Sequence, residues 1–204
     1  MDYFGQVQHR LQADRLFSQL LIRSGLMPER VTQSSSSRHP QRGLKLAIHA
    51  VIGKRHVPFL RRKLIAAHAV LRPALRELSI ALVGDGPMSR LHRKFMNVEG
   101  PTDVLTFPLE LDGRHRAVSG EVIVCVPEAR RQAKLRGTKA EEEVLLYALH
   151  GMLHLCGFDD RTQSAFRKMH RMEDEILTRL GIGPVFALPT AKSNSHRPRR
   201  SFGA

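Results

Sequence analysis

The segment at residues 139–156 is the strongest helix prediction in this 204-residue chain, and it limits what the chain can fold into. Thr138 precedes the segment and is the expected N-cap. Three consecutive acidic residues at 141–143 lie in the first turns, where the helix dipole favours negative charge. Gly157 follows as the expected stop, because glycine takes the left-handed conformation that ends many helices. The fold is therefore expected to be built around this helix.

Two histidines lie four residues apart near the end of the predicted helix. His150 and His154 should project from the same helix face, so that both imidazoles can bind one metal ion. The spacing alone is a weak signal, because a chain with 11 histidines contains such a pair by chance about half the time. The alternative is two histidines on a partly buried helix face.

The residues after the helix favour the metal site. Gly157 allows the chain to reverse, and Asp160 then stands where a third ligand can complete the set. Two histidines, one carboxylate and an open position for water are typical of a catalytic zinc site, although the same ligands suit non-haem iron. We therefore predict one Zn²⁺ per chain on His150, His154 and Asp160, with another divalent metal as the alternative.

The residue after the first histidine argues against one class of hydrolase. In zinc peptidases with the HExxH motif, that residue is the glutamate that acts as general base. Here it is Gly151, so the group that would take the proton from water is missing. A peptidase of this class is therefore disfavoured.

Strand and helix patterns alternate through the rest of the chain. We predict an α+β (α/β-like) fold with a single mixed β-sheet of about four strands, flanked by helices, and with the metal site on a helix and the following turn. The expected strands are residues 44–52, 78–83, 102–108 and 120–126. The expected further helices are residues 57–71, 88–97, a segment starting at 127, and 162–180.

The chain is expected to have one folded domain with an extension at each end. Residues 44–183 carry the predicted strands and helices. Residues 1–43 are predicted to form an N-terminal extension with a serine-rich linker, and residues 184–204 are predicted to form a basic disordered tail.

Charge and cysteine content indicate the partners and the compartment. The net charge of +14 favours a polyanion, either nucleic acid or an anionic membrane surface, although a basic tail alone is the simpler alternative. Cys125 and Cys156 form no CxxC pair, which fits a reducing compartment. No stretch approaches 18 apolar residues and no secretory leader is recognisable, so we predict a cytoplasmic protein without a membrane partner.

Three motifs together resemble the YbeY family of bacterial metal-dependent endoribonucleases. The string HGMLHLCGFDD at 150–160 resembles the signature HGxLHLxGYDH of that family. The strings PTDVLTFP at 101–108 and GEVIVCVPE at 120–128 resemble its PTDVLSFP and GDIVIxxPxV segments, in the same order. The resemblance covers about residues 44–182.

The resemblance implies a function and a set of partners. It implies a zinc-dependent endoribonuclease that cleaves single-stranded RNA in ribosomal RNA processing, at the 3′ end of 16S rRNA, and in ribosome quality control. The implied partners are ribosomal RNA and the small ribosomal subunit or an assembly GTPase, with no small-molecule cofactor. The alternative is a non-catalytic ribosome- or RNA-binding assembly factor with a structural metal.

Two positions depart from the family pattern. The third ligand of the family is histidine where this chain has Asp160, and Asp159 matches the motif aspartate, for which we expect an orienting or turn-forming role. Met96 stands where the family has an arginine thought to engage RNA. Arg93 lies on the same predicted helix face and is the expected substitute, unless Arg93 and Lys94 form only a solvated basic face.

Several other polar residues have two possible readings. Glu121 matches a family aspartate and would either orient a metal-binding histidine or end a strand in solvent. The basic residues of 130–136 would either contact phosphates or form a solvated surface. Four isolated histidines are expected not to be ligands: His49, His56, His68 and His170.

Overall fold

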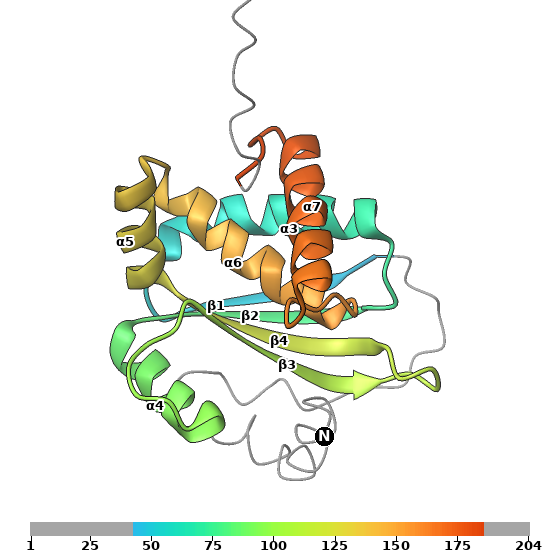
Figure 1. Cartoon of the computed structure of the whole chain (residues 1–204), viewed down its shortest axis with the longest axis horizontal. Helices are drawn as coiled ribbons and strands as arrows, with labels where there is room; N and C mark the ends of the chain where they lie inside the picture. Colours follow the sequence, from blue (N-terminus) through green and yellow to red (C-terminus); the bar gives the residue numbers. More distant parts are fainter. Residues whose placement is uncertain (1–42, 186–204) are drawn as a thin grey trace, which may run out of the picture.

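The computed structural model describes residues 43–185 as a four-stranded sheet with helices on both faces (Figure 1). The strands are β1 (Lys45–Ala50), β2 (Glu77–Val83), β3 (Val104–Leu111) and β4 (Ala117–Cys125). The helices are the short 3₁₀ helix η2 (Lys54–His56) and the α-helices α3 (Val57–Leu71), α4 (Asp85–Met96), α5 (Val126–Arg136), α6 (Ala140–Leu155) and α7 (Gln163–Arg179). The predicted fold class is confirmed.

The sheet is mixed, with the strand order β1-β2-β4-β3. β1, β2 and β4 are parallel, and β3 pairs antiparallel with β4 at the edge. The parallel pair β1 and β2 is joined through α3, as a parallel crossover requires. Helices α3, α5, α6 and α7 lie on one side of the sheet and α4 lies on the other (Figure 1).

Helix α6 is the centre of the main core. It contacts β3 and β4 below it and α3, α5 and α7 around it. Eleven of its residues are buried. The sequence of a helix that is buried on most sides is a nearly continuous run of apolar residues. This explains the apolar run at residues 144–149. A smaller cluster, which includes Met88 and Leu91 of α4 and Ile123 of β4, fills the opposite face of the sheet.

Two glycines let α6 approach the sheet closely. A Cβ atom on Gly151 of α6 would lie 2.6 Å from Val122 Cγ1 and 2.7 Å from Thr106 Oγ1. A Cβ atom on Gly120 of β4 would lie 2.5 Å from Leu155 Cδ1. All three distances are too short for a Cβ atom. The backbone at Gly151 and at Gly120 therefore packs directly against side chains of the other element, at two points of the interface between α6 and the sheet.

The predicted N-cap of α6 is wrong by one residue. Lys139 is the N-cap, and its backbone N–H donates to Glu142 Oε2 at 3.3 Å. The hydroxyl of Thr138 donates instead to Glu143 Oε1 at 3.0 Å, and Arg136 contacts the same carboxylate. Glu143 is buried, and a buried carboxylate needs such partners. The hydroxyl of Thr138 therefore binds the buried carboxylate of Glu143 instead of capping the helix.

Two other predicted boundaries are also shifted. Helix α4 begins at Asp85, with Gly84 as its N-cap in extended conformation, because the proline at position 87 is tolerated in the first turn. The strands β3 and β4 are longer than predicted and meet in a hairpin turn at residues 112–116. The hairpin pairing supplies the hydrogen bonds that extend both strands.

The predictions for residues 1–42 and 186–204 lie outside the described residues. Within residues 43–185, no helix has the length and apolar character needed to cross a membrane.

We expect opposite effects from the same substitution in two helices. Gly151→Ala should lower the free energy of unfolding by about 1–3 kcal/mol, because the new methyl group overlaps Val122 and Thr106. Gly86→Ala in α4 is the matched control, since its Cβ would meet only Arg90 Nη1 at 3.6 Å. It should raise stability by up to about 1 kcal/mol through helix propensity. Urea denaturation measures both, and equal effects would contradict the close approach at Gly151.

Candidate metal centre

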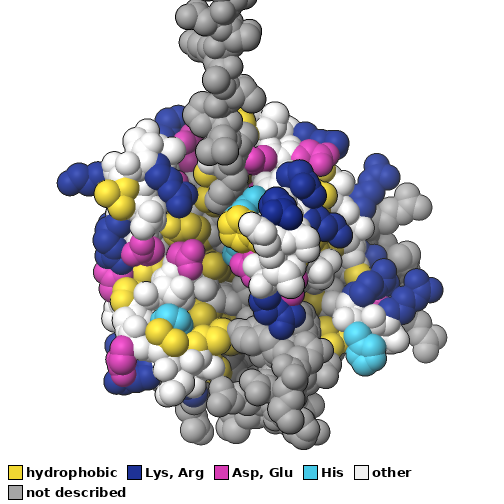
Figure 2. Space-filling view, viewed as in Figure 1, with side chains coloured by type: hydrophobic (Ala, Val, Ile, Leu, Met, Phe, Trp, Pro, Cys, Tyr) yellow, Lys and Arg dark blue, Asp and Glu magenta, His cyan; other side chains and the backbone are white. Residues whose placement is uncertain are grey.

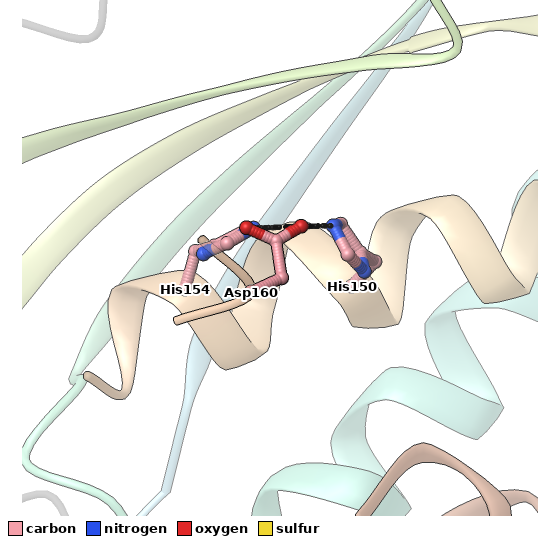
Figure 3. A group of neighbouring side chains, drawn as sticks. All are labelled: His150, His154 and Asp160. Atoms are coloured by element: carbon pink, nitrogen blue, oxygen red, sulfur yellow. Dashed lines mark hydrogen bonds and ion pairs between the residues drawn. The ribbon is translucent and has the colours of Figure 1, made fainter. Parts of the chain in front are cut away.

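Three potential metal ligands converge at the end of α6 (Figure 3). The Nε2 atoms of His150 and His154 are 3.1 Å apart. Asp160, from the chain that follows the helix, places Oδ2 3.6 Å from Nε2 of His150 and 3.9 Å from Nε2 of His154. The structure therefore brings together the three residues that the sequence analysis named.

The donor atoms have the spacing of ligands around one zinc ion. Ligand atoms about 2.0–2.2 Å from a tetrahedral zinc lie about 3.3–3.6 Å from one another. The three observed separations, 3.1, 3.6 and 3.9 Å, bracket this range. Two imidazoles and a carboxylate also match the ligand set of catalytic zinc sites. The residues present therefore fit a divalent metal.

A turn at the end of α6 positions two of the three groups. Gly157 is left-handed, with φ 88°, and its N–H donates to the carbonyl of His154, while the N–H of Phe158 donates to that of Leu153. This is the Schellman pattern, and the predicted stop at Gly157 is confirmed. The carbonyl of Phe158 lies 3.1 Å from Nδ1 of His154. The same turn thus carries Asp160 back to the helix and orients His154.

A buried glutamate holds the first histidine. Glu173 of α7 is fully buried, and its Oε1 lies 2.8 Å from Nδ1 of His150. Its Oε2 lies 2.5 Å from Nδ1 of His170. With Nδ1 engaged, the Nε2 atom of His150 faces the other two ligands, as a carboxylate partner of a metal-binding histidine requires.

Sequence reasoning missed Glu173, although a signal was present. The buried residues of α7 are Met169, Glu173, Ile176 and Leu177, at helical spacing along one face. An acidic residue inside an apolar stripe needs a buried partner. Only the fold shows that the partner is His150.

The two histidines have opposite pKa shifts. Burial favours the neutral imidazole of His150, but the hydrogen bond and charge of Glu173 outweigh burial and raise the pKa. Burial and the charge of His150 lower the pKa of His154. One imidazole is therefore neutral at neutral pH, which is the form that binds a metal.

Asp159 does not join the ligand group. Its Oδ1 accepts the backbone N–H of Asp160 at 2.9 Å, and its carboxylate pairs with the guanidinium of Arg161 at 2.8 Å. These contacts form the turn that presents Asp160. Within the described residues, His49, His56, His68 and His170 belong to no cluster that could hold a metal.

Comparisons with known proteins show the family of this chain. Residues 54–181 match the family described as Endoribonuclease YbeY. The Endoribonuclease YbeY of Acidothermus cellulolyticus is 40% identical over an alignment of 115 residues that covers 51% of this chain and 70% of that protein. That of Beutenbergia cavernae is 42% identical over an alignment of 108 residues that covers 50% of this chain and 72% of that protein. The solution structure of TM1509 from Thermotoga maritima is more distant, at 25% identity and a TM-score of 0.48 over 72% of this chain and 99% of that one.

This chain belongs to the YbeY endoribonuclease family.

A cavity of about 560 Å³ opens beside the three ligands. Met96, at the position of the expected family arginine, lines this cavity together with His150, His154 and Asp160. Arg93 is not among the described residues that line it. Its side chain is 61% exposed and lies 3.4 Å from Glu99. The structure therefore brings Met96 to the ligands but not Arg93, and a catalytic role for Arg93 stays a prediction.

Both readings of Glu121 are wrong. Its strand neighbours Gly120 and Val122 face α6, so alternation along β4 turns Glu121 to the opposite face, away from the histidines. Glu121 is 2% exposed, so it is not a solvated strand end either. Its Oε1 has no hydrogen-bond partner among the described residues. Burial raises the pKa of Glu121 to about 7.

Two of the four basic residues of α5 are engaged with acids. Arg131 pairs with Asp85 and Glu128, both at 2.7 Å, and Arg136 pairs with Glu143 at 3.2 Å. The Asp85 contact joins α4 to α5. These two arginines therefore connect elements of the fold.

We expect Glu121 to make stability depend on pH. The pKa of Glu121 is raised in the folded protein, so folded Glu121 keeps a proton that the unfolded chain loses between about pH 4.5 and 7. Stability should therefore fall as pH rises through this window. Glu121→Gln should remove a fall of roughly 2–3 kcal/mol between pH 5 and pH 8.

Urea denaturation at pH 5 and pH 8 measures this difference. Glu175→Gln, at an exposed glutamate of α7, is the control and should leave the pH dependence of the native protein unchanged. Equal pH dependence in the native and Glu121→Gln proteins would contradict the prediction.

Proposed function

We propose that this chain is a metal-dependent endoribonuclease in which His150, His154 and Asp160 hold one divalent metal ion, with zinc favoured. The observation that carries the proposal is the orientation of the two imidazoles. Each Nδ1 atom is engaged by Glu173 or by the Phe158 carbonyl, so both Nε2 atoms face Asp160. Such a set supports a ligand group better than a chance histidine pair.

The residues of the site have separate tasks in the proposed reaction. When bound, a metal ion supplies Lewis acidity toward a phosphodiester oxygen or a water molecule. His150, His154 and Asp160 would hold this ion, while Glu173 keeps the first imidazole oriented. The cavity beside the ligands leaves one side open, where an RNA phosphate can enter.

We further propose single-stranded ribosomal RNA as the substrate. The curated relatives are named as endoribonucleases, and the net charge of +14 favours a polyanionic partner. Processing at the 3′ end of 16S rRNA, in the cytoplasm and together with the small ribosomal subunit or an assembly GTPase, extends the same proposal. No small-molecule cofactor is required for it.

One observation favours a second candidate function. Met96 lines the cavity where an arginine was expected, and a thioether cannot neutralise a phosphate. Without that charge, the chain could bind ribosomal RNA as an assembly factor and hold its metal only for structure. Cleavage assays separate the two candidates.

We expect Glu173→Gln to weaken metal binding by about 10- to 100-fold, because an amide orients His150 less strongly than a carboxylate. The measurement is competition for zinc against a chelator of known affinity. Glu175→Gln, on the same helix but exposed, should bind zinc like the native protein. Native protein that binds no zinc, or equal affinities in all three proteins, would contradict the proposed ligand set.

We expect His150→Ala to abolish cleavage of a single-stranded RNA and Arg93→Ala to reduce it less than about threefold. The first variant loses a ligand, whereas Arg93 lies outside the cavity lining. Gel analysis of a labelled oligonucleotide measures both. Inert native protein together with an active Met96→Arg variant would favour the assembly factor. A large loss in Arg93→Ala would restore that arginine as the substitute for Met96.

A further inference from the structure

Three residues other than glycine have left-handed backbone conformation among residues 43–185. They are Arg72 with φ 46°, Asn97 with φ 58° and His115 with φ 56°. Each sits where glycine is the usual choice, at a helix C-cap or in a hairpin turn. Asparagine and histidine are enriched in this conformation among residues other than glycine, whereas arginine pays a conformational cost there. Such a cost persists when the side chain has a use.

Two of these three left-handed residues line the same cavity. Arg72 ends α3, and His115 lies in the turn between β3 and β4, 43 positions later by residue number, yet both line the cavity that holds the metal ligands. Asn97 does not line it. Figure 1 places the α3–β2 connection and the β3–β4 turn at the same end of the sheet. Figure 2 shows Lys and Arg side chains gathered over that end.

A second cavity of about 270 Å³ continues from the first. The two share Arg72 and Arg116 as lining residues, and Arg76 lines the second. The backbone N–H of Arg76 donates to the carbonyl of Val118 at 2.7 Å, which ties the α3–β2 connection to the start of β4. This hydrogen bond therefore holds in place the backbone that carries the cationic side chains.

Arg116 and Arg72 differ in their partners: a carboxylate binds the first, and no carboxylate of the described residues binds the second. Nε and Nη2 of Arg116 donate to Asp112 Oδ2 at 2.9 and 2.7 Å, which fixes the guanidinium. Hydrogen bonds from Arg116 and Arg114 lower the pKa of Asp112 to about 2, so this carboxylate stays ionised. Within the described chain, no carboxylate lies within ion-pairing distance of Arg72. Arg72 can therefore receive an anion.

We propose that Arg72 and His115 form a phosphate-binding subsite for RNA next to the metal ligands, with Arg116 held beside them by Asp112. This inference rests on the proposed function. The cavity lining holds three aspartates and three arginines; Arg161 pairs with Asp159, whereas Arg72 and Arg116 also line the second cavity. A single strand that lays one phosphate at the metal ligands meets these cations with its neighbouring phosphates. The subsite thereby supplies, from other elements, the positive charge that Met96 lacks.

The test exchanges each of the two left-handed residues of the cavity for glycine. Arg72→Gly and His115→Gly remove a phosphate contact and relieve the backbone, so melting temperature should stay equal or rise. Affinity for a labelled single-stranded RNA should fall about five- to tenfold for Arg72→Gly. The slope of log affinity against log salt should decrease by about 0.7 for each lost phosphate contact. Arg72→Lys keeps the charge and should retain the salt slope.

Asn97→Gly is the matched control, because it makes the same backbone change outside the cavity. It should leave both the melting temperature and the RNA affinity nearly unchanged, because asparagine tolerates the left-handed conformation. The readouts are fluorescence anisotropy over a salt series, with the probe checked on a gel, and differential scanning fluorimetry. Unchanged affinity in both Arg72→Gly and His115→Gly overturns the subsite. A lower melting temperature in Arg72→Gly also overturns it, because the arginine would then serve the turn.

The cleavage assay separates this inference from the proposed function. Native protein that cleaves RNA, with unchanged affinity in the two glycine variants, contradicts the subsite alone. Native protein that binds RNA through these residues but does not cleave it supports the subsite and contradicts the endoribonuclease. Native protein that binds no single-stranded RNA contradicts both.

Discussion

The close approach of α6 to the sheet is the constraint on which the site depends. Gly151 of the helix meets Val122 and Thr106 of the strands, and Gly120 of β4 meets Leu155. Because neither position has room for a Cβ atom, the helix has one depth and one rotation relative to the sheet. His150 precedes Gly151 directly, so the direction of the first imidazole is set by the same contact. Gly151, which stands where HExxH peptidases have their glutamate, therefore lets the helix pack closely against the sheet.

Burial of Glu173 extends this constraint to α7. An isolated buried carboxylate is costly, and here both oxygens have imidazole partners, in His150 and His170. The His170 ring also packs edge-on against Phe166. A helix that must place Glu173 against His150 can dock on α6 in only one register. The orientation of a ligand and the docking of the last helix are thus one interaction.

Much of the fold was predictable because its signals are local. The helix that ends at Gly157 follows from a run of apolar residues and a glycine stop. The four strands follow from alternation and β-branched residues. Boundaries were less predictable, since Thr138 serves the buried Glu143 instead of capping the helix. A side chain with a tertiary partner can override a local preference, and the partner is invisible until the chain is folded.

The candidate site was predictable where its residues are close in sequence. His150, His154 and Asp160 lie within one helix end and one turn, so the histidine spacing together with Gly157 and the resemblance of the motifs indicates convergence. Glu173 and Glu121 needed the tertiary structure. One is buried against a histidine 23 residues earlier, and the other is turned away by strand alternation. The residue type alone does not show in which direction either glutamate side chain points.

The position of positive charge is the hardest property to predict from this sequence. The basic helix at 130–136 looked suited to phosphate, but Arg131 and Arg136 are engaged with acids in the folded chain. Arg72, an unremarkable residue in the sequence, stands at the cavity because α3 ends there. Coulombic attraction acts through space, so a charge near the metal ligands matters more than one near Met96 in sequence. A family position can therefore lose its arginine while an arginine from another element, such as Arg72, lines the same cavity.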